Sequence, residues 1–425
     1  MKSPALFLLC GTFILPVGSA RAAEPPDLAG AVTRVVSAAD FDVNGYRVLC
    51  GSDTQSAVYV SANESTNNAG CPNQAPYVGE TASIYGRLKK KKLTIQATQI
   101  DLHISPFPAL IEGSAVIDAM LPGNPARPER GAVLVQADGF RILIDKNTRV
   151  KWNPPVDSLD KVGPGEWIEY KGTLSSSGVL LAASAKFTVN YVTTNELALQ
   201  RREEFDPSAV PASKKQGPLG VALIGINPRK LPSYNDPGMQ ARVDEIGSRL
   251  IPAYQRALPD GDVRKIAFRF QLVDSPLMRD ALTLSNGMIL VPRQVVERMQ
   301  NDSQLATVLA DNIACVLERQ EYRLSPLSGV TSAAVFALEV SDPFGLGAAE
   351  AAKMQTYALN QSGRVSLTLL HDAGYNISQA PLAWWRLAPV AMSQLSQTPA
   401  PGRAVYLYEM LGALWGRSAL TGPVQ

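Results

Sequence analysis

The chain has 425 residues, and its 40 lysines and arginines nearly balance its 38 acidic residues, which gives a formal net charge of +2. A chain of this length accommodates two or three domains, each with its own core. Because neither half is strongly basic, bulk electrostatics give no reason for nucleic-acid binding, and we expect no nucleic-acid partner.

The N-terminus has the composition of an export signal. Lys2 precedes an apolar run over residues 5–17, and residues 20–22 (Ala-Arg-Ala) match an A-x-A cleavage site. The run is shorter than the roughly 20 residues that a spanning helix needs. We therefore predict a signal peptide over residues 1–22 and a mature chain, without a transmembrane segment, that is periplasmic or secreted.

Residues 27–190 contain short segments of alternating hydrophobicity bounded by Gly, Pro, Asn and Asp, which is typical of small antiparallel sheets. A Gly-Glu pair followed by a glycine and a leucine occurs with identical spacing in residues 79–88 and 165–174. We predict tandem β-barrel-like modules over residues 27–105 and 110–192. They resemble the OB-like barrels of exported bacterial proteins, for which we favour a spacing role; binding of an envelope polymer is the alternative.

The mature chain has three cysteines, Cys50, Cys71 and Cys315. In an oxidising compartment, Cys50 and Cys71 are expected to form a disulfide that closes a loop rich in Ser, Asn and Gly. Two free buried thiols are the alternative. Cys315 would then be left without a partner cysteine, in a helix.

After a predicted helix over residues 194–204, a proline-containing stretch at 205–218 has the composition of a linker. Residues 219–425 then form the predicted C-terminal domain, because apolar residues recur at helical spacing. Strand patterns cover residues 265–273 and 287–291. Helical patterns cover residues 236–257, 304–317, 348–359, 364–372, 379–386 and 404–416. The predicted fold class is α+β, with a small sheet and a helical majority.

The stretch QLATVLADNIACVLERQ, residues 304–320, resembles the zinc helix of the Ste24-like and HtpX-like metallopeptidases (metallopeptidase family 48). The pattern of that family runs Glu-Leu-Ala-x-Val-Leu-x-His-Glu-x-x-His-Val. Residues 280–282 (Asp-Ala-Leu) and 286–291 (Asn-Gly-Met-Ile-Leu-Val) resemble its strand hairpin. LHDAGYNISQAPLAWWRLA, residues 370–388, resembles its Ala-Gly-Tyr-Asp segment and the helix that follows. The resemblance spans residues 236–390 and implies a zincin-type fold.

The positions that hold zinc in this family are changed in this chain. Two histidines at i and i+4 share a helix face and bind one Zn²⁺, and the intervening Glu acts as general base. Here these three positions are Asp311, Asn312 and Cys315. Counting back from the Ala-Gly-Tyr motif, the third ligand falls on Leu359 and its supporting Asp on Gly363.

These changes predict the loss of hydrolysis. An amide neither takes up nor releases a proton near neutral pH, so Asn312 cannot act as the base. Asp311 and Cys315 have suitable spacing, but a catalytic zinc site needs three protein ligands. The only histidines are His103 and His371, in different regions. We predict no metal ion, no cofactor and no catalytic residue; zinc is expected only if the chain is an active metalloendopeptidase with substitute ligands.

The sequence thus predicts an exported pseudopeptidase that binds or scaffolds a peptide or protein in the cell envelope. In the resembling family, the strand hairpin lines the cleft and pairs with extended substrate, which is binding by strand addition. The expected peptide-pairing residues are Ala281, Leu282, Asn286, Gly287, Met288 and Ile289.

Overall fold

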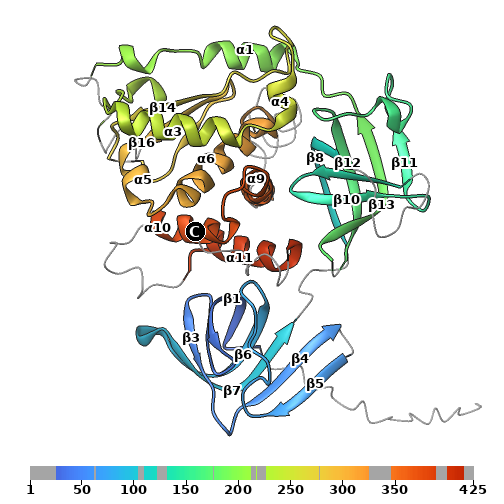
Figure 1. Cartoon of the computed structure of the whole chain (residues 1–425), viewed down its shortest axis with the longest axis vertical. Coiled ribbons are helices and arrows are strands. Elements are labelled where there is room, and N and C mark those ends of the chain that lie inside the picture. Colours follow the sequence, from blue (N-terminus) through green and yellow to red (C-terminus); the bar gives the residue numbers. More distant parts are fainter. Residues whose placement is uncertain are drawn as a thin grey trace, which may run out of the picture.

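The structure is a computed structural model that describes residues 25–61, 64–103, 110–121, 132–175, 177–211, 217, 226–276, 278–324, 346–388 and 400–415. It contains two β-barrels and a larger α+β domain (Figure 1). Helix α11 (Gly402–Leu414) lies between the first barrel and the rest of the molecule.

The first barrel is a seven-stranded sheet in the order β3-β2-β1-β6-β7-β4-β5, closed by parallel pairing of β3 with β7. Its strands are β1 (Leu28–Ser37), β2 (Asp40–Val43), β3 (Tyr46–Leu49), β4 (Gln55–Ser61), β5 (Glu64–Ala69), β6 (Thr81–Lys89) and β7 (Thr94–His103). The basic cluster at Lys90–Lys92 forms the 3-10 turn η1 between β6 and β7, with no buried residue.

The second barrel has the strand order β10-β9-β8-β12-β13-β11 and is closed by pairing of β10 with β13. Its elements are β8 (Ile111–Leu121), β9 (Val133–Ala137), β10 (Phe140–Ile144), β11 (Arg149–Trp152), the turn η2 (Leu159–Lys161), β12 (Trp167–Leu174) and β13 (Val179–Thr188). This order repeats that of the first barrel, strand for strand, apart from β5. The sequence duplication is therefore a duplication of topology.

The repeated glycines have a packing reason. A Cβ built at Gly86 would lie 2.1 Å from the carbonyl oxygen of Gln96, and one at Gly172 would lie 2.3 Å from that of Leu181. Both distances are too short for a side chain, because the neighbouring strand approaches closely at each register shift.

The strand that has no counterpart is β5, which forms a hairpin with β4. Cys50 precedes this hairpin and Cys71 follows it, and a disulfide joins them with a Cα–Cα distance of 5.7 Å. The hairpin ends are thus covalently tied together. Cys315 is a free cysteine.

The α+β domain contains a three-stranded sheet of β14 (Arg269–Val273), β15 (Leu282–Thr283) and β16 (Met288–Pro292). The central strand is β16, which pairs parallel with β14 and antiparallel with β15. All five residues of β16 are buried. Of the two edge strands, β14 and β15, it is β15 that packs against α6 (Asp302–Leu317).

The other helical elements surround this sheet. They are α1 (Thr194–Arg202), η3 (Pro207–Ala209), η5 (Pro228–Lys230), α3 (Pro237–Leu250), α4 (Ala253–Ala257), α5 (Arg293–Arg298), α7 (Gln320–Leu324), α9 (Leu346–Asp372), η7 (Ile377–Gln379) and α10 (Ala380–Leu387).

Two predicted helix boundaries were wrong. The helix expected over residues 236–257 is divided, because Pro252 lacks an N–H donor and α3 ends just before it. The break expected between residues 359 and 364 does not occur, since α9 is continuous. Gly363 is accommodated because α11 packs closely there: a Cβ at this position would lie 3.3 Å from Leu407 Cδ2.

The second barrel and the α+β domain share one continuous apolar core, whereas the first barrel has a core of its own. Helix α9, seen end-on in Figure 1, lies between α6 and the second barrel. The second barrel is thus built into the α+β domain, and the first is attached beside it.

Among the described residues, none of the helices combines the length and hydropathy needed to cross a bilayer. The predicted signal peptide, residues 1–22, lies outside the described residues, as do residues 212–216 and 218 of the predicted linker.

Candidate functional site

Helix α6 carries the three positions that resemble the zinc motif. Asn301 caps its N-terminus, accepting a hydrogen bond from the Gln304 amide at 2.9 Å. From Gln304 to Leu317 every side chain except Cys315 is buried, because the helix packs against α3, α9 and the sheet. The chain therefore holds this motif in the interior of the α+β domain.

Asp311 forms an ion pair with Arg403, which comes from α11. The same guanidinium reaches Asp280 at 3.2 Å and lies over the ring of Trp384, 3.4 Å from its centroid. Ser362 of α9 donates a hydrogen bond to Asp311 at 3.0 Å. A guanidinium stays charged at any physiological pH, so the protein itself supplies a permanent cation beside Asp311.

Asn312 is engaged on both sides of its amide. Its Nδ2 donates to the Val308 carbonyl at 2.8 Å, and its Oδ1 accepts a hydrogen bond from the Thr283 hydroxyl of β15. These contacts join α6 to the edge strand. A side-chain amide neither takes up nor releases a proton near neutral pH, so Asn312 is not a base.

Cys315 is the one residue of this stretch that is only partly buried. Burial, followed by the negative charge of Asp311, raises the pKa of the Cys315 thiol. The thiol is therefore protonated at neutral pH, which disfavours both nucleophilic attack and metal coordination, because each requires the thiolate.

The α9 positions expected to match the third ligand and its support do not face Asp311. Leu359 is 46% exposed, and Gly363 packs against α11. Ser362 is the α9 residue that reaches Asp311, and its hydroxyl is a weak metal ligand. Within the described part of the chain, no group of three His, Cys, Asp or Glu side chains could hold a metal ion.

The expected peptide-pairing residues divide between two strands. Met288 and Ile289 lie on β16, which already has a strand on each side, so they cannot pair with a peptide. Asn286 and Gly287 lie in the turn before it, where Asn286 donates to Glu204 at 3.0 Å. Met288 and Ile289 are therefore not available for strand addition, whereas peptide binding by Asn286 and Gly287 stays a prediction. Of the six expected residues, Ala281 and Leu282 lie at or beside the edge strand β15, which pairs with β16 alone among the described strands.

In the edge strand β15, one residue directs its backbone N–H and C=O away from the sheet. Leu284 donates to Met288 at 2.9 Å, and Leu282 is opposite Leu290. Because hydrogen-bonded and non-hydrogen-bonded pairs alternate in antiparallel sheets, the N–H and C=O of Thr283 point away from β16. Thr283 is thus the position where another extended chain could add to the sheet.

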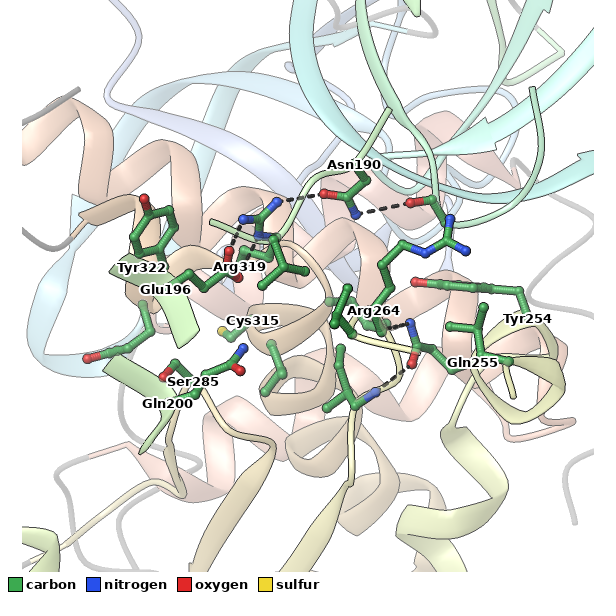
Figure 2. Close-up of a pocket in the computed structure, with 18 of the residues that line it drawn as sticks. Asn190, Glu196, Gln200, Tyr254, Gln255, Arg264, Ser285, Cys315, Arg319 and Tyr322 are labelled. Carbon is green, nitrogen blue, oxygen red and sulfur yellow. Dashed lines mark hydrogen bonds and ion pairs between the residues drawn. The ribbon is translucent and has the colours of Figure 1, made fainter. Parts of the chain in front are cut away.

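A pocket opens beside this edge (Figure 2). Thr283 and Ser285 of the edge segment and Cys315 of α6 line it, together with residues of α1, the segment after β13 and α4. Arg319, in the left-handed conformation that ends α6, is paired with Glu196 and donates to Asn190 at 2.6 Å. These paired charges form one wall of the pocket.

The opposite wall links the second barrel to the α+β domain. Arg264 contacts Glu166 at 3.2 Å and Asp262 at 2.9 Å. Gln255 accepts from the Ile266 amide at 3.0 Å and holds this segment in place. Arg319 and Arg264 are thus each paired with a carboxylate. The pocket therefore suits an uncharged side chain better than an anionic one.

Sequence reasoning missed Arg403 and the contacts that Asp280, Ser362 and Thr283 make. One signal was available: Arg403 begins a largely apolar helical segment at residues 402–414, where a buried cation requires an acidic partner. The pairing itself joins elements about ninety residues apart and follows only from the fold. The two histidines lie apart, His103 on β7 and His371 on α9.

The chain matches no protein-family model, and it matches no curated protein.

Proposed function

We propose that this chain is a metallopeptidase-like protein of the exported class that no longer hydrolyses peptides and instead binds an extended peptide or protein segment at the β15 edge. The zincin-type relationship rests on the three sequence landmarks between residues 236 and 390. The expected export signal at residues 1–22 supports a role in the periplasm or outside the cell.

The observation that carries the loss of hydrolysis is the Arg403 guanidinium between Asp311 and Asp280. In a zinc peptidase, a divalent cation balances the charge of its ligands and activates water. Here a side-chain cation balances Asp311, and a guanidinium neither offers open coordination positions nor lowers the pKa of a bound water. In addition, Asn312 occupies the position of the general base, and its amide cannot accept the proton of a water molecule.

This arrangement also disfavours an active metallopeptidase with substitute ligands. Zinc at Asp311 would have to displace Arg403, which would thereby lose one of its two described carboxylate partners, Asp311 and Asp280. It would also require deprotonation of Cys315, whose thiol pKa is raised. Both costs act against metal binding.

Peptide binding is supported by the free edge at Thr283 and the pocket beside it. Strand addition draws its affinity from main-chain hydrogen bonds, and a neighbouring pocket selects a side chain. The pocket between α6 and the second barrel would receive one side chain of a peptide paired with Thr283. Its paired charges favour an apolar or amide side chain over an anionic one.

The test uses the full chain and a fluorescent unfolded probe, reduced carboxymethylated casein fragments, with binding followed by anisotropy. Thr283→Pro removes the backbone N–H that points away from β16. Because about one main-chain hydrogen bond to the peptide is then lost, binding is expected to weaken about tenfold. Thr283→Ser keeps both the backbone N–H and the hydroxyl that bonds to Asn312, and it is the matched control. Equal binding by the wild type and both variants would refute the proposed strand addition.

A further inference from the structure

The first barrel carries a polar hollow that plays no part in the site above. It is formed on β4, β5 and β7 and lined by Gln55, Ser56, Ala57, Tyr59, Asn67, Asn68, Ala69, Gln99 and Asp101. The lining consists of amides, hydroxyls, one carboxylate and two alanines. It contains neither lysine nor arginine, and we name it the polar hollow.

The sheet register places the main polar groups on one face. Gln55 is opposite Gln99, and Ala57 is opposite both Asp101 and Asn67. Residues directly opposite each other in neighbouring strands project from the same side of the sheet. The amides therefore surround Asp101, and the small side chain of Ala57 leaves room between them.

Asp101 is the fixed centre of this face. Its side chain is only 6% exposed, and Gln99 donates to both of its carboxylate oxygens, at 3.0 and 3.1 Å. A carboxylate accepts more hydrogen bonds than these, so it retains acceptor capacity toward the hollow. Ser56, which also lines the hollow, is opposite Ile100, so its side chain projects from the other face of the sheet.

An aromatic surface adjoins the polar groups. The Tyr59 ring stacks on His103, with centroids 5.0 Å apart and planes inclined by 16°. Burial, followed by the charge of Asp101, raises the pKa of Tyr59, consistent with a phenol close to that carboxylate. A flat ring beside planar amides suits a ligand that has both an apolar face and a rim of hydroxyl groups.

We propose that the polar hollow binds a neutral saccharide. Adjacent sugar hydroxyls can donate to Asp101 and exchange hydrogen bonds with Gln55, Gln99 and Asn67, and the apolar face of a pyranose can pack on Tyr59. A nucleic acid is disfavoured, because its phosphates would meet a buried carboxylate and no basic side chain in the lining.

The hairpin that builds the hollow supports a dedicated role. The β5 strand, which supplies Asn67 and Asn68, has no counterpart among the described strands of the second barrel. The Cys50–Cys71 disulfide ties the ends of this hairpin, in which Asn67 is opposite Ala57 on the face that carries Asp101. This proposal rests on the first barrel alone and is independent of peptide binding at β15.

The test titrates the full chain with chitotetraose, cellotetraose and maltotetraose by calorimetry, with the oligonucleotide dT10 for comparison. We expect saturable binding of at least one tetrasaccharide and none of dT10. Asp101→Asn is expected to weaken that binding roughly tenfold to a hundredfold, since a hydrogen bond to a charged group is lost. Tyr59→Ala is expected to weaken it about tenfold, and Tyr59→Phe to preserve it.

Tyr191→Ala is the matched control, because Tyr191 is 61% exposed and lies outside the hollow. Thermal unfolding of each variant shows whether the barrel is intact. The proposal is overturned if no tetrasaccharide saturates, if dT10 binds in place of the sugars, or if folded Asp101→Asn and Tyr59→Ala bind like the wild type.

Discussion

The two barrels share a strand order but meet the α+β domain in different ways. Each has a two-residue turn with positive φ angles between corresponding strands: Asn44-Gly45 in the first and Asp138-Gly139 in the second. The Asn44 side chain forms hydrogen bonds within its own barrel. It accepts one from the Ala31 backbone N–H and donates one to the Ala29 carbonyl, each at 3.0 Å. Asp138 instead pairs with a helix of the other domain.

The exchange of Asn for Asp changes what this turn does. Asp138 is fully buried and receives Arg364 of α9, whose Nε donates to the Asp138 carbonyl at 3.0 Å. Tyr170 also donates to this carboxylate, at 2.5 Å. In the first barrel, Gly45 lies against Trp385 by close contact, without a charge. The second barrel thus shares a core with the α+β domain, whereas the first barrel has a separate core.

The largest expected effect concerns the fused barrel. Arg364→Ala would leave the buried Asp138 carboxylate without its cation, and we expect a loss of about 3–5 kcal/mol in the free energy of unfolding. Arg34→Ala in the first barrel, whose partners Asp40 and Asp42 are near the surface, is the control and should cost less than about 1 kcal/mol. Chemical denaturation measures both. Similar losses would remove the distinction between the barrels.

An intermediate effect is expected at the disulfide of the first barrel. Cys50→Ser combined with Cys71→Ser opens a loop with a sequence separation of 21 residues, for which loop entropy predicts a loss of about 3 kcal/mol. Because the first barrel has its own core, the loss should be confined to it. Hydrogen exchange should show faster exchange in β1–β7 only; equal acceleration in β8–β13 would show that the barrels unfold as one unit.

A graded effect that depends on pH follows from Asp118 on β8. Neither of its carboxylate oxygens has a hydrogen-bond partner in the described structure. Burial, followed by the charges of Asp372 and Asp138, raises the pKa of Asp118 from 3.8 to about 8. The folded state therefore keeps a proton that the unfolded state releases, so stability falls as pH rises from about 4 to 8, by roughly 1.4 kcal/mol per pH unit.

Asp118→Asn should remove this contribution and flatten the pH dependence of unfolding. Glu318, whose pKa is raised mainly by burial and then by Asp138 and Asp118, should leave a residual slope of the same sign. Urea titrations of the wild type and the variant at several pH values measure the difference. Parallel curves would contradict a buried, protonated Asp118 in the second barrel.

Local patterns were sufficient to predict the barrels from sequence. Gly86 and Gly172 recur because strands cross closely at those points, and such a constraint is visible in a single chain. The helical stretch over residues 304–317 was equally clear, because its apolar side chains follow one period and Asn301 supplies a cap. The division of one predicted helix at Pro252 was missed, although proline is a local signal.

The candidate site could be predicted only in part. The changed positions on α6 are read from the sequence, but the cation beside Asp311 comes from α11 and depends on tertiary packing. The same holds for Arg364, which meets a turn more than two hundred residues earlier in the chain. The central place of β16 in its sheet was not predicted, since a short apolar run does not reveal whether it is central or at an edge.

The most direct test of the proposed loss of hydrolysis is the metal content of the purified full chain, measured by mass spectrometry together with casein hydrolysis on the same sample. With Arg403 paired to Asp311, we predict far less than one zinc per chain and no cleavage that responds to a chelator. One tightly bound zinc per chain, with cleavage that stops when the zinc is removed and returns when it is restored, would contradict that prediction.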